Sequence, residues 1–171
     1  MNLVNSQPDG SFGMFFGHPQ RGDKSKQMVE RLLDEFGFDF AKIKSILNPI
    51  VTNNGGKVTT LQEPIKLAFT NSKPAWKSQP YYPESKYKAD VGFNLGNRWI
   101  MVEVELSDIR RGVSFNYMST IFVTGYMRLG IIIVPESISP EKHKTFYSKL
   151  VTRCNFHSPN FPLWVIGFEY P

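Results

Sequence analysis

The sequence predicts an α/β protein in which helices cover both faces of a mixed β-sheet. Three patterns support this fold class: helical stripes of apolar residues, an alternating hairpin centred on Gly96-Asn97, and a wholly apolar run over residues 131–134. A short apolar run bounded by turn residues is typical of a strand that is buried on both faces. Helices on both sides of one sheet account best for the order of these elements.

Size and composition predict one domain spanning residues 1–171. With 41% hydrophobic and 14% aromatic residues, the chain can bury a sizeable core. No apolar run approaches the roughly 20 residues needed to cross a bilayer, and the N-terminus lacks the pattern of a secretory signal. A single cysteine, Cys154, excludes an internal disulfide and favours a cytoplasmic location. The net charge of +5 is compatible with a polyanionic partner.

Two helices are expected after an irregular arm. Residues 1–23 are rich in Gly, Pro, Asn and Asp, which predicts the arm. Apolar residues at i, i+3, i+4 and i+7 predict a helix over residues 26–36. Asp39 is the expected N-cap of a second helix over residues 40–47.

The section before the hairpin is expected to contain extended chain. Residues 57–69 predict one or two strands around Pro64. Residues 71–86 hold three prolines and three aromatic residues, which favours a structured surface loop over disorder.

The clearest pattern is the hairpin over residues 88–106. Two alternating strands flank the Gly96-Asn97 turn. One face is apolar and is expected to face the core; it carries Ala89, Val91, Phe93, Ile100, Val102, Val104 and Leu106. The other face carries Lys88, Asp90, Asn94, Met101, Glu103 and Glu105.

A helix–strand–helix–strand series is predicted after the hairpin. An apolar stripe predicts a helix over residues 109–129, and the apolar run 131–134 reads as a central strand. The second hairpin strand, this helix and this strand should form a right-handed crossover that makes the two strands parallel. A helix over residues 140–153 and a strand over residues 163–168 complete the chain.

The hairpin is predicted to gather three acids on one face. Asp90 should lie opposite Glu103, with Glu105 two residues further along. Opposed side chains have Cβ atoms roughly 4.5–5.5 Å apart, and like charges in such pairs destabilise a sheet. A cluster retained against this repulsion suggests a bound cation, and oxygen ligands favour a hard ion such as Mg²⁺.

These acids could support metal-assisted chemistry on a phosphate. Asp90 and Glu103 would be the metal ligands, and Glu105 would either be a further ligand or orient and deprotonate the attacking water. Lys88, on the same face, would neutralise charge or contact a phosphate. The simpler alternative is that the acids form the solvated face of a half-exposed hairpin, because alternating polar residues are usual there.

Residues 86–135 resemble the catalytic core of PD-(D/E)xK nucleases. Asp90, the short turn, Glu103-Val104-Glu105, the helix with SFNYMSTIFVTGYMRLG and the strand GIIIVP are similar to type II restriction endonucleases of the BamHI and BglII kind. Ala89 stands where the superfamily name places proline. Glu105 stands where most members have lysine, although the BamHI kind similarly has glutamate.

The resemblance implies a fold, an activity and a set of partners. It implies a restriction-endonuclease-like core over about residues 57–135 and Mg²⁺-dependent hydrolysis of phosphodiester bonds in double-stranded DNA, with Mn²⁺ able to substitute. It also implies a homodimer that reads a palindrome in a restriction–modification context. Asp90, Glu103 and Glu105 would take the three catalytic positions.

Basic and small polar residues around the acids are candidates for binding DNA. Lys86 and Lys88 precede the hairpin, and Arg110, Arg111 and Ser114 follow it. Lys and Arg contacts to phosphates position a duplex. Basic residues at a helix N-terminus oppose the helix dipole, so Arg110 and Arg111 favour an anionic ligand nearby. A solvated surface is the alternative for each of these side chains.

Two other functions remain open from the sequence. One keeps the nuclease chemistry but acts on an intermediate of DNA repair, recombination or a mobile element. The other is a non-catalytic DNA-binding or interaction module. Cys154 and His157 lack the third group of a catalytic thiol site and read as structural. Trp76, Tyr81 and Tyr82 could stack on unpaired bases, although loop packing is the simpler role.

Overall fold

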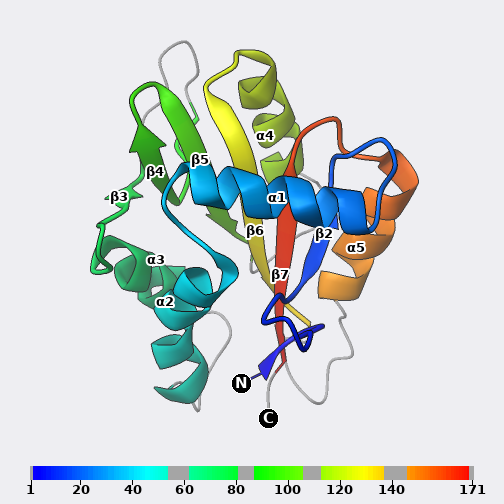
Figure 1. Ribbon diagram of the computed structural model, residues 1–171. Helices are drawn as coiled ribbons and strands as arrows, with labels where there is room; N and C mark the ends of the chain where they lie inside the picture. Colours follow the sequence, from blue (N-terminus) through cyan, green and yellow to red (C-terminus); the bar gives the residue numbers. More distant parts are fainter. Residues whose placement is uncertain (1, 54–61, 81–86, 106–112, 137–145, 170–171) are drawn as a thin grey trace.

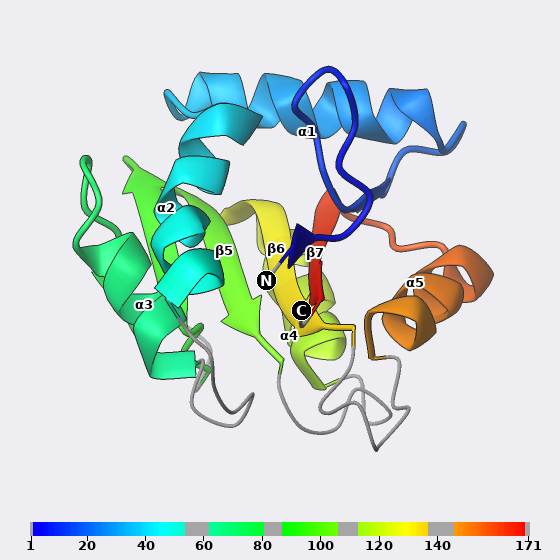
Figure 2. The same cartoon turned by 90° about the horizontal axis from the view of Figure 1, so that it is seen from below.

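The computed structural model describes residues 2–53, 62–80, 87–105, 113–136 and 146–169. In this part of the chain helices cover both faces of one mixed sheet, which confirms the predicted α/β class (Figures 1 and 2). None of the described helices is long and apolar enough to cross a membrane.

The sheet combines a parallel centre with antiparallel edges. Its strands follow the order β1-β7-β6-β5-β4-β3, and β2 pairs with β7 on the same edge as β1. Strands β5, β6 and β7 are mutually parallel, whereas β4 runs antiparallel to β5 and β3 to β4. The strands are β1 (Asn2–Leu3), β2 (Met14–Phe16), β3 (Lys77–Ser78), β4 (Val91–Leu95), β5 (Arg98–Val104), β6 (Met127–Pro135) and β7 (Leu163–Glu169).

Two cores form, one on each face of the sheet. Helices α1 (Asp23–Glu35), α2 (Phe40–Asn53) and α3 (Gln62–Thr70) cover one face, and α4 (Val113–Val123) and α5 (Phe146–His157) cover the other (Figure 2). The first core includes Val29, Leu33, Ile43, Phe69, Val102, Ile131 and Trp164. The second includes Met101, Met118, Ile121, Ile132, Leu150 and Val165.

The first two predicted helices are confirmed, and the second is longer than expected. The backbone N–H of Lys42 donates to Asp39 Oδ1 at 2.7 Å, so Asp39 caps α2 as predicted. The helix continues past residue 47 with Pro49 inside it. A proline removes one helical hydrogen bond, and the burial of Ile50 in the core offsets that loss.

The strands predicted over residues 57–69 are wrong from residue 62 on, because residues 62–70 form α3; residues 57–61 lie outside the described residues. Pro64 lies in the first turn of this helix, where a missing N–H removes no helical bond. Ile65 and Phe69 are four residues apart and both pack in the core. Burial of this stripe selects the helix.

The helix predicted over residues 109–129 ends earlier than expected. Helix α4 ends at Val123, Gly125 has φ of 82°, and β6 begins at Met127. Glycine adopts this left-handed conformation without a steric penalty, so it reverses the chain here. The predicted parallel pairing of the two crossover strands is confirmed. For the helix predicted over residues 140–153, the described part is α5, and residues 140–145 lie outside the described residues.

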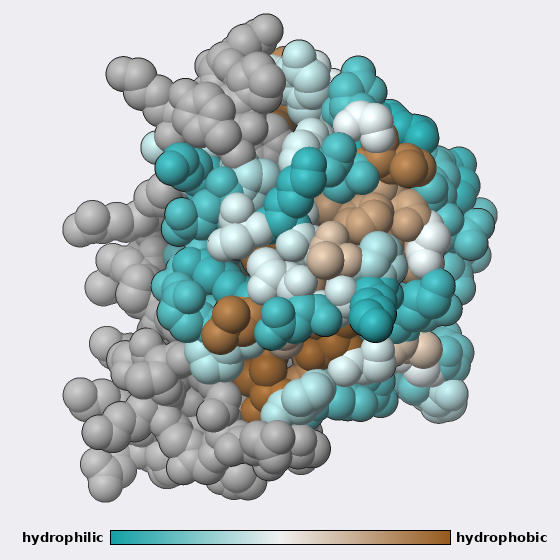
Figure 3. Space-filling view, turned by 90° about the vertical axis from the view of Figure 1, so that its left-hand side faces the viewer, coloured by the Kyte–Doolittle hydropathy of each residue, from teal (hydrophilic) through white to brown (hydrophobic). Residues whose placement is uncertain are grey.

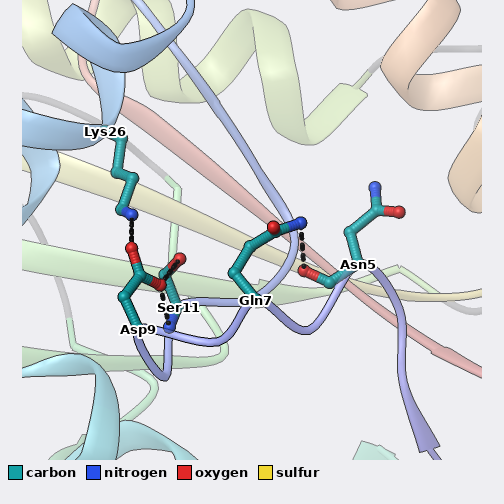
Figure 4. A network of polar contacts seen from close by, with 5 residues as sticks. All are labelled: Asn5, Gln7, Asp9, Ser11 and Lys26. Atoms are coloured by element: carbon teal, nitrogen blue, oxygen red, sulfur yellow. Dashed lines mark hydrogen bonds and ion pairs between the residues drawn. The ribbon is translucent and has the colours of Figure 1, made fainter.

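The arm predicted over residues 1–23 is not wholly irregular. Strands β1 and β2 pair with β7, and a polar network joins the segment between them to α1 (Figure 4). Asp9 accepts hydrogen bonds from the N–H and hydroxyl of Ser11 and pairs with Lys26. These contacts hold the pKa of Asp9 well below its usual range. The edge of β7 accepts β1 and β2 as pairing partners, which explains why this Gly-rich N-terminal segment is ordered.

Replacing Gly13 with alanine should weaken this edge. Gly13 has φ of 77°, and a Cβ there would lie 2.3 Å from the backbone oxygen of Val165. Gly10 has φ of 84° but nothing within 4 Å of its Cβ position. We expect Gly10→Ala to cost about 1 kcal/mol through the left-handed backbone alone. Gly13→Ala should cost about 1–3 kcal/mol more through the clash. Urea denaturation measures both, and equal losses would contradict the clash.

Candidate functional site

The β4–β5 hairpin has the predicted register. Gly96 has φ of 63°, which suits the two-residue turn Gly96-Asn97. The strand pairing ends with Val91 and Val102, one step before Asp90 and Glu103, and the Asp90 side chain turns toward α3. The pairs are Val91 with Val102, Gly92 with Met101, Phe93 with Ile100, Asn94 with Trp99 and Leu95 with Arg98.

The acids lie at the carboxyl ends of the parallel strands. Glu103 is the second-last residue of β5, and Glu105 directly follows this strand. Asp90 directly precedes the antiparallel β4. Strands β6 and β7 end at the same edge of the sheet because they run parallel to β5. This edge is where open α/β sheets commonly bind ligands.

The hairpin face that carries Glu103 is covered rather than half-solvated. Met101 is fully buried, and Glu103 is 7% exposed. The second core, which includes Met118 of α4, packs on this face. Reading the acids as a solvated surface is therefore wrong for Glu103. In the described part of the chain, the buried charged residues are Glu103 and Lys66.

Glu103 is a buried carboxyl that is only partly satisfied. The hydroxyl of Tyr87 and the backbone N–H of Asp90 donate hydrogen bonds to it. Among the residues that the structure describes, its Oε1 atom has no hydrogen-bond partner. Burial raises the pKa of Glu103 to about 8, and the charges of Asp90 and Glu105 add to the effect. Ionising Glu103 is therefore costly unless a cation lies beside it.

Asp90 is held from two directions. The backbone N–H of Val104 donates to its Oδ2 at 2.9 Å. From α3, Gln62 Nε2 donates to its Oδ1 at 2.9 Å, and Lys66 Nζ lies 3.1 Å from the same oxygen. The side chains of Lys66 and Asp90 are 10% and 13% exposed, so this is a largely buried ion pair.

Sequence reasoning missed Lys66 because residues 57–69 were read as strands. Burial by itself would lower the pKa of Lys66, but hydrogen bonds to Glu63 and Asp90 outweigh burial and raise it. Gln62 and Lys66 are four residues apart on α3, which places them on one face. If this segment had been predicted as a helix, Gln62 and Lys66 would have stood out as polar residues next to the apolar stripe of Ile65 and Phe69.

A hydrogen bond from the first turn of α4 orients the Glu105 side chain. Ser114 Oγ donates to Glu105 Oε2 at 2.8 Å, and the backbone N–H of Glu105 donates to the carbonyl of Ile133 at 2.9 Å. Ser114 is buried, so its hydroxyl serves the acid in this structure rather than an exposed DNA contact.

The remaining predicted DNA contacts are only partly described. Lys88 is exposed next to the site. Lys86, Arg110 and Arg111 lie outside the described residues, and their role in DNA binding stays a prediction.

The donor set fits a hard divalent ion with two protein ligands. Within the described part of the chain, Glu103 Oε1 has no hydrogen-bond partner, and Asp90 Oδ2 accepts from the Val104 N–H. Among the described residues, no group of three His, Cys, Asp or Glu side chains is arranged to hold a metal ion. Mg²⁺ is usually held by one or two carboxylates, with waters and phosphate oxygens completing its shell. Asp90 and Glu103 match that pattern.

The burial of Cys154 and Trp76 argues against the thiol chemistry and the base stacking considered from the sequence. Cys154 is buried, and burial raises the pKa of its thiol to about 12, so it would not form a thiolate near neutral pH. Trp76 packs in the first core with Phe38 and Phe69, which confirms the packing role. Tyr81 and Tyr82 lie outside the described residues.

Two cavities lined by described residues lie away from the acids. One of about 600 Å³ is lined by β2, the turn before α1 and the end of α5. Another of about 430 Å³ lies between α2 and α3. Figure 3 shows the left-hand side of the view in Figure 1, where apolar patches are set among hydrophilic side chains. Neither cavity is lined by Asp90, Glu103 or Glu105.

The raised pKa of Glu103 should make metal-free folding less favourable as pH rises. The folded protein keeps this carboxyl protonated up to about pH 8, whereas the unfolded chain ionises it near 4.5. The folded state therefore binds more protons between these values, and the free energy of unfolding should fall by a few kcal/mol at most. Glu103→Gln should remove this decline, and the exposed Glu63→Gln should keep it. Urea denaturation in EDTA across this pH range measures both; an unchanged slope in Glu103→Gln would contradict the assignment.

Removing the cation from α3 should destabilise the metal-free protein. Lys66→Met leaves Asp90 largely buried without its charged partner, at an expected cost of roughly 2–4 kcal/mol. Lys73→Met, at an exposed position after α3, should change stability by less than about 0.5 kcal/mol. Chemical denaturation at neutral pH compares the two, and similar small losses would show that the pair is not energetically important.

No protein-family model and no curated protein sequence matches this chain. The function is therefore argued from the chemistry of the site.

Proposed function

We propose that this protein is a Mg²⁺-dependent endonuclease that hydrolyses phosphodiester bonds of double-stranded DNA, of the restriction type. The observation that carries the proposal is Glu103, a buried carboxyl beside Asp90 and Glu105 whose Oε1 has no hydrogen-bond partner among the described residues. An ionised acid in this position is costly unless a cation compensates it. The site also lies at the strand edge where an extended substrate can approach.

Asp90 and Glu103 would hold the ion. Bound there, Mg²⁺ or Mn²⁺ supplies Lewis-acid polarisation of the phosphate and a more acidic bound water. The Val104 N–H and Gln62 fix the orientation of the Asp90 carboxylate before any ion binds. Such preorganisation lowers the reorganisation needed during reaction.

The remaining side chains would position the reacting groups. Glu105, oriented by Ser114, would accept a proton from the attacking water. The water oxygen then bonds to phosphorus as the bond to the leaving oxygen breaks, and that oxygen takes a proton from solvent. Lys66 contributes positive charge from α3, on the Asp90 side of the site. Electrostatic stabilisation of the charge on the phosphoryl group is the main requirement of this chemistry.

The electrostatics of the chain support a nucleic acid as substrate. The net charge is +5 although three acids gather at one point. Lys88 is exposed beside the acids, and a basic surround would bring DNA phosphates toward an otherwise repulsive site. A homodimer would present two such sites to the two strands of a palindrome.

Asp90→Asn should abolish DNA cleavage, and thermal unfolding checks that the variant stays folded after losing the ion pair with Lys66. The wild-type protein should cut plasmid DNA with Mg²⁺ or Mn²⁺ and not with EDTA. Asn keeps the shape but loses the charge that holds the ion, so the rate should fall by at least about a hundredfold. Gel analysis of plasmid cleavage measures the rate, and Asp34→Asn on the exposed side of α1 is the matched control.

The outcome also separates the alternatives. Equal cutting by Asp90→Asn and wild type would contradict the role of Asp90. Discrete fragments would indicate sequence-specific cleavage, whereas cutting confined to branched or damaged DNA would indicate a repair or recombination role. DNA binding without cleavage under any of these conditions would indicate the non-catalytic module.

A further inference from the structure

Two tyrosines stack beside the acids. The rings of Tyr87, just before β4, and Tyr117, on α4, have centroids 4.1 Å apart and lie 11° from parallel. This is the most nearly parallel of the ring pairs among the described residues. The hydroxyl of Tyr87 donates to Glu103, so the stack begins directly at the buried acid.

The outer ring of this stack is open to solvent. Tyr117 is 43% exposed, whereas Tyr87 is partly buried. Tyr87 stacks on one face of the Tyr117 ring, so a planar ligand that extends the stack would cover the opposite face. Exposed aromatic surface next to a reactive site is available to a planar ligand.

The surface around Tyr117 suits a nucleotide strand. Helix α4 carries no charged residue, and Asn116 and Thr120 are exposed beside the ring. Lys88 is exposed next to Tyr87 in the chain. A phosphate backbone therefore meets neutral polar groups and a cation along this path, which favours its approach.

We propose that Tyr117 is a stacking platform for an unpaired nucleobase, so that the preferred substrate presents at least one unpaired nucleotide beside the acids. The inference rests on the proposed nuclease function and adds a condition to it: within double-stranded DNA, the preferred site contains a nucleotide that is unpaired or flipped out of the helix. In a duplex both faces of each base are covered by neighbouring bases, so only an unpaired or extruded base can cover the ring. Every base has a π-face, so the platform would not select sequence.

Binding to a matched pair of oligonucleotides tests the platform. One labelled duplex carries a single unpaired thymidine, and the other carries an abasic residue at the same place. Fluorescence anisotropy with Ca²⁺ in place of Mg²⁺ measures affinity. The wild type should bind the thymidine duplex roughly tenfold more tightly than the abasic one. Tyr117→Ala should lose this preference, and Tyr117→Phe should keep it because the ring is retained.

A second exposed aromatic residue provides the control. Phe156 on α5 is 85% exposed, and Phe156→Ala should keep the wild-type preference. Thermal unfolding of each variant checks that the fold is retained. An equal preference in Tyr117→Ala and wild type, or no preference in the wild type, would overturn the platform. If plasmid cleavage by the wild type persists in that case, only the platform is wrong; if the wild type neither binds nor cuts DNA, the nuclease proposal fails as well.

Discussion

The pairing of β4 with β5 is the constraint on which the candidate site depends. It brings the residue before β4 next to the end of β5, so Asp90 and Glu103 share one edge of the sheet. The backbone then links the two acids in both directions: the Asp90 N–H donates to Glu103, and the Val104 N–H donates to Asp90. A one-residue slip in register would send every side chain of a strand to the opposite face and separate the acids.

The layers on each side of the hairpin make this edge chemically unusual. Burial raises the pKa of Glu103 although the hydrogen bond from Tyr87 opposes the rise, and α3 brings Lys66 and Gln62 to Asp90. Neighbouring carboxyls thus experience different surroundings, one desolvated and one ion-paired. Nearby acids in such unlike surroundings are a common feature of catalytic sites. Glu103 Oε1 also has no hydrogen-bond partner among the described residues, so a cation there would compensate the ionised carboxylate.

Local patterns were reliable where short-range chemistry decides the conformation. Gly96-Asn97 and the flanking alternation predicted the hairpin register, and the apolar run 131–134 predicted the central strand. Patterns failed where distant partners decide. Residues 57–69 were predicted to form strands, but Ile65 and Phe69 pack in the core on one stripe of a helix over residues 62–70. Residues 14–16 became a strand because β7 offers a free edge.

By itself the sequence determined the fold class, the hairpin and the set of three acids, because alternation and turn residues act over a few neighbouring positions. Only the tertiary structure decided how each acid behaves. Whether Glu103 meets water or Tyr87 depends on where the crossover helix packs, and whether Asp90 has a cation depends on α3 reaching it from 24 residues earlier in the chain. Burial and long-range ion pairing are properties of packed layers, so no local pattern carries them.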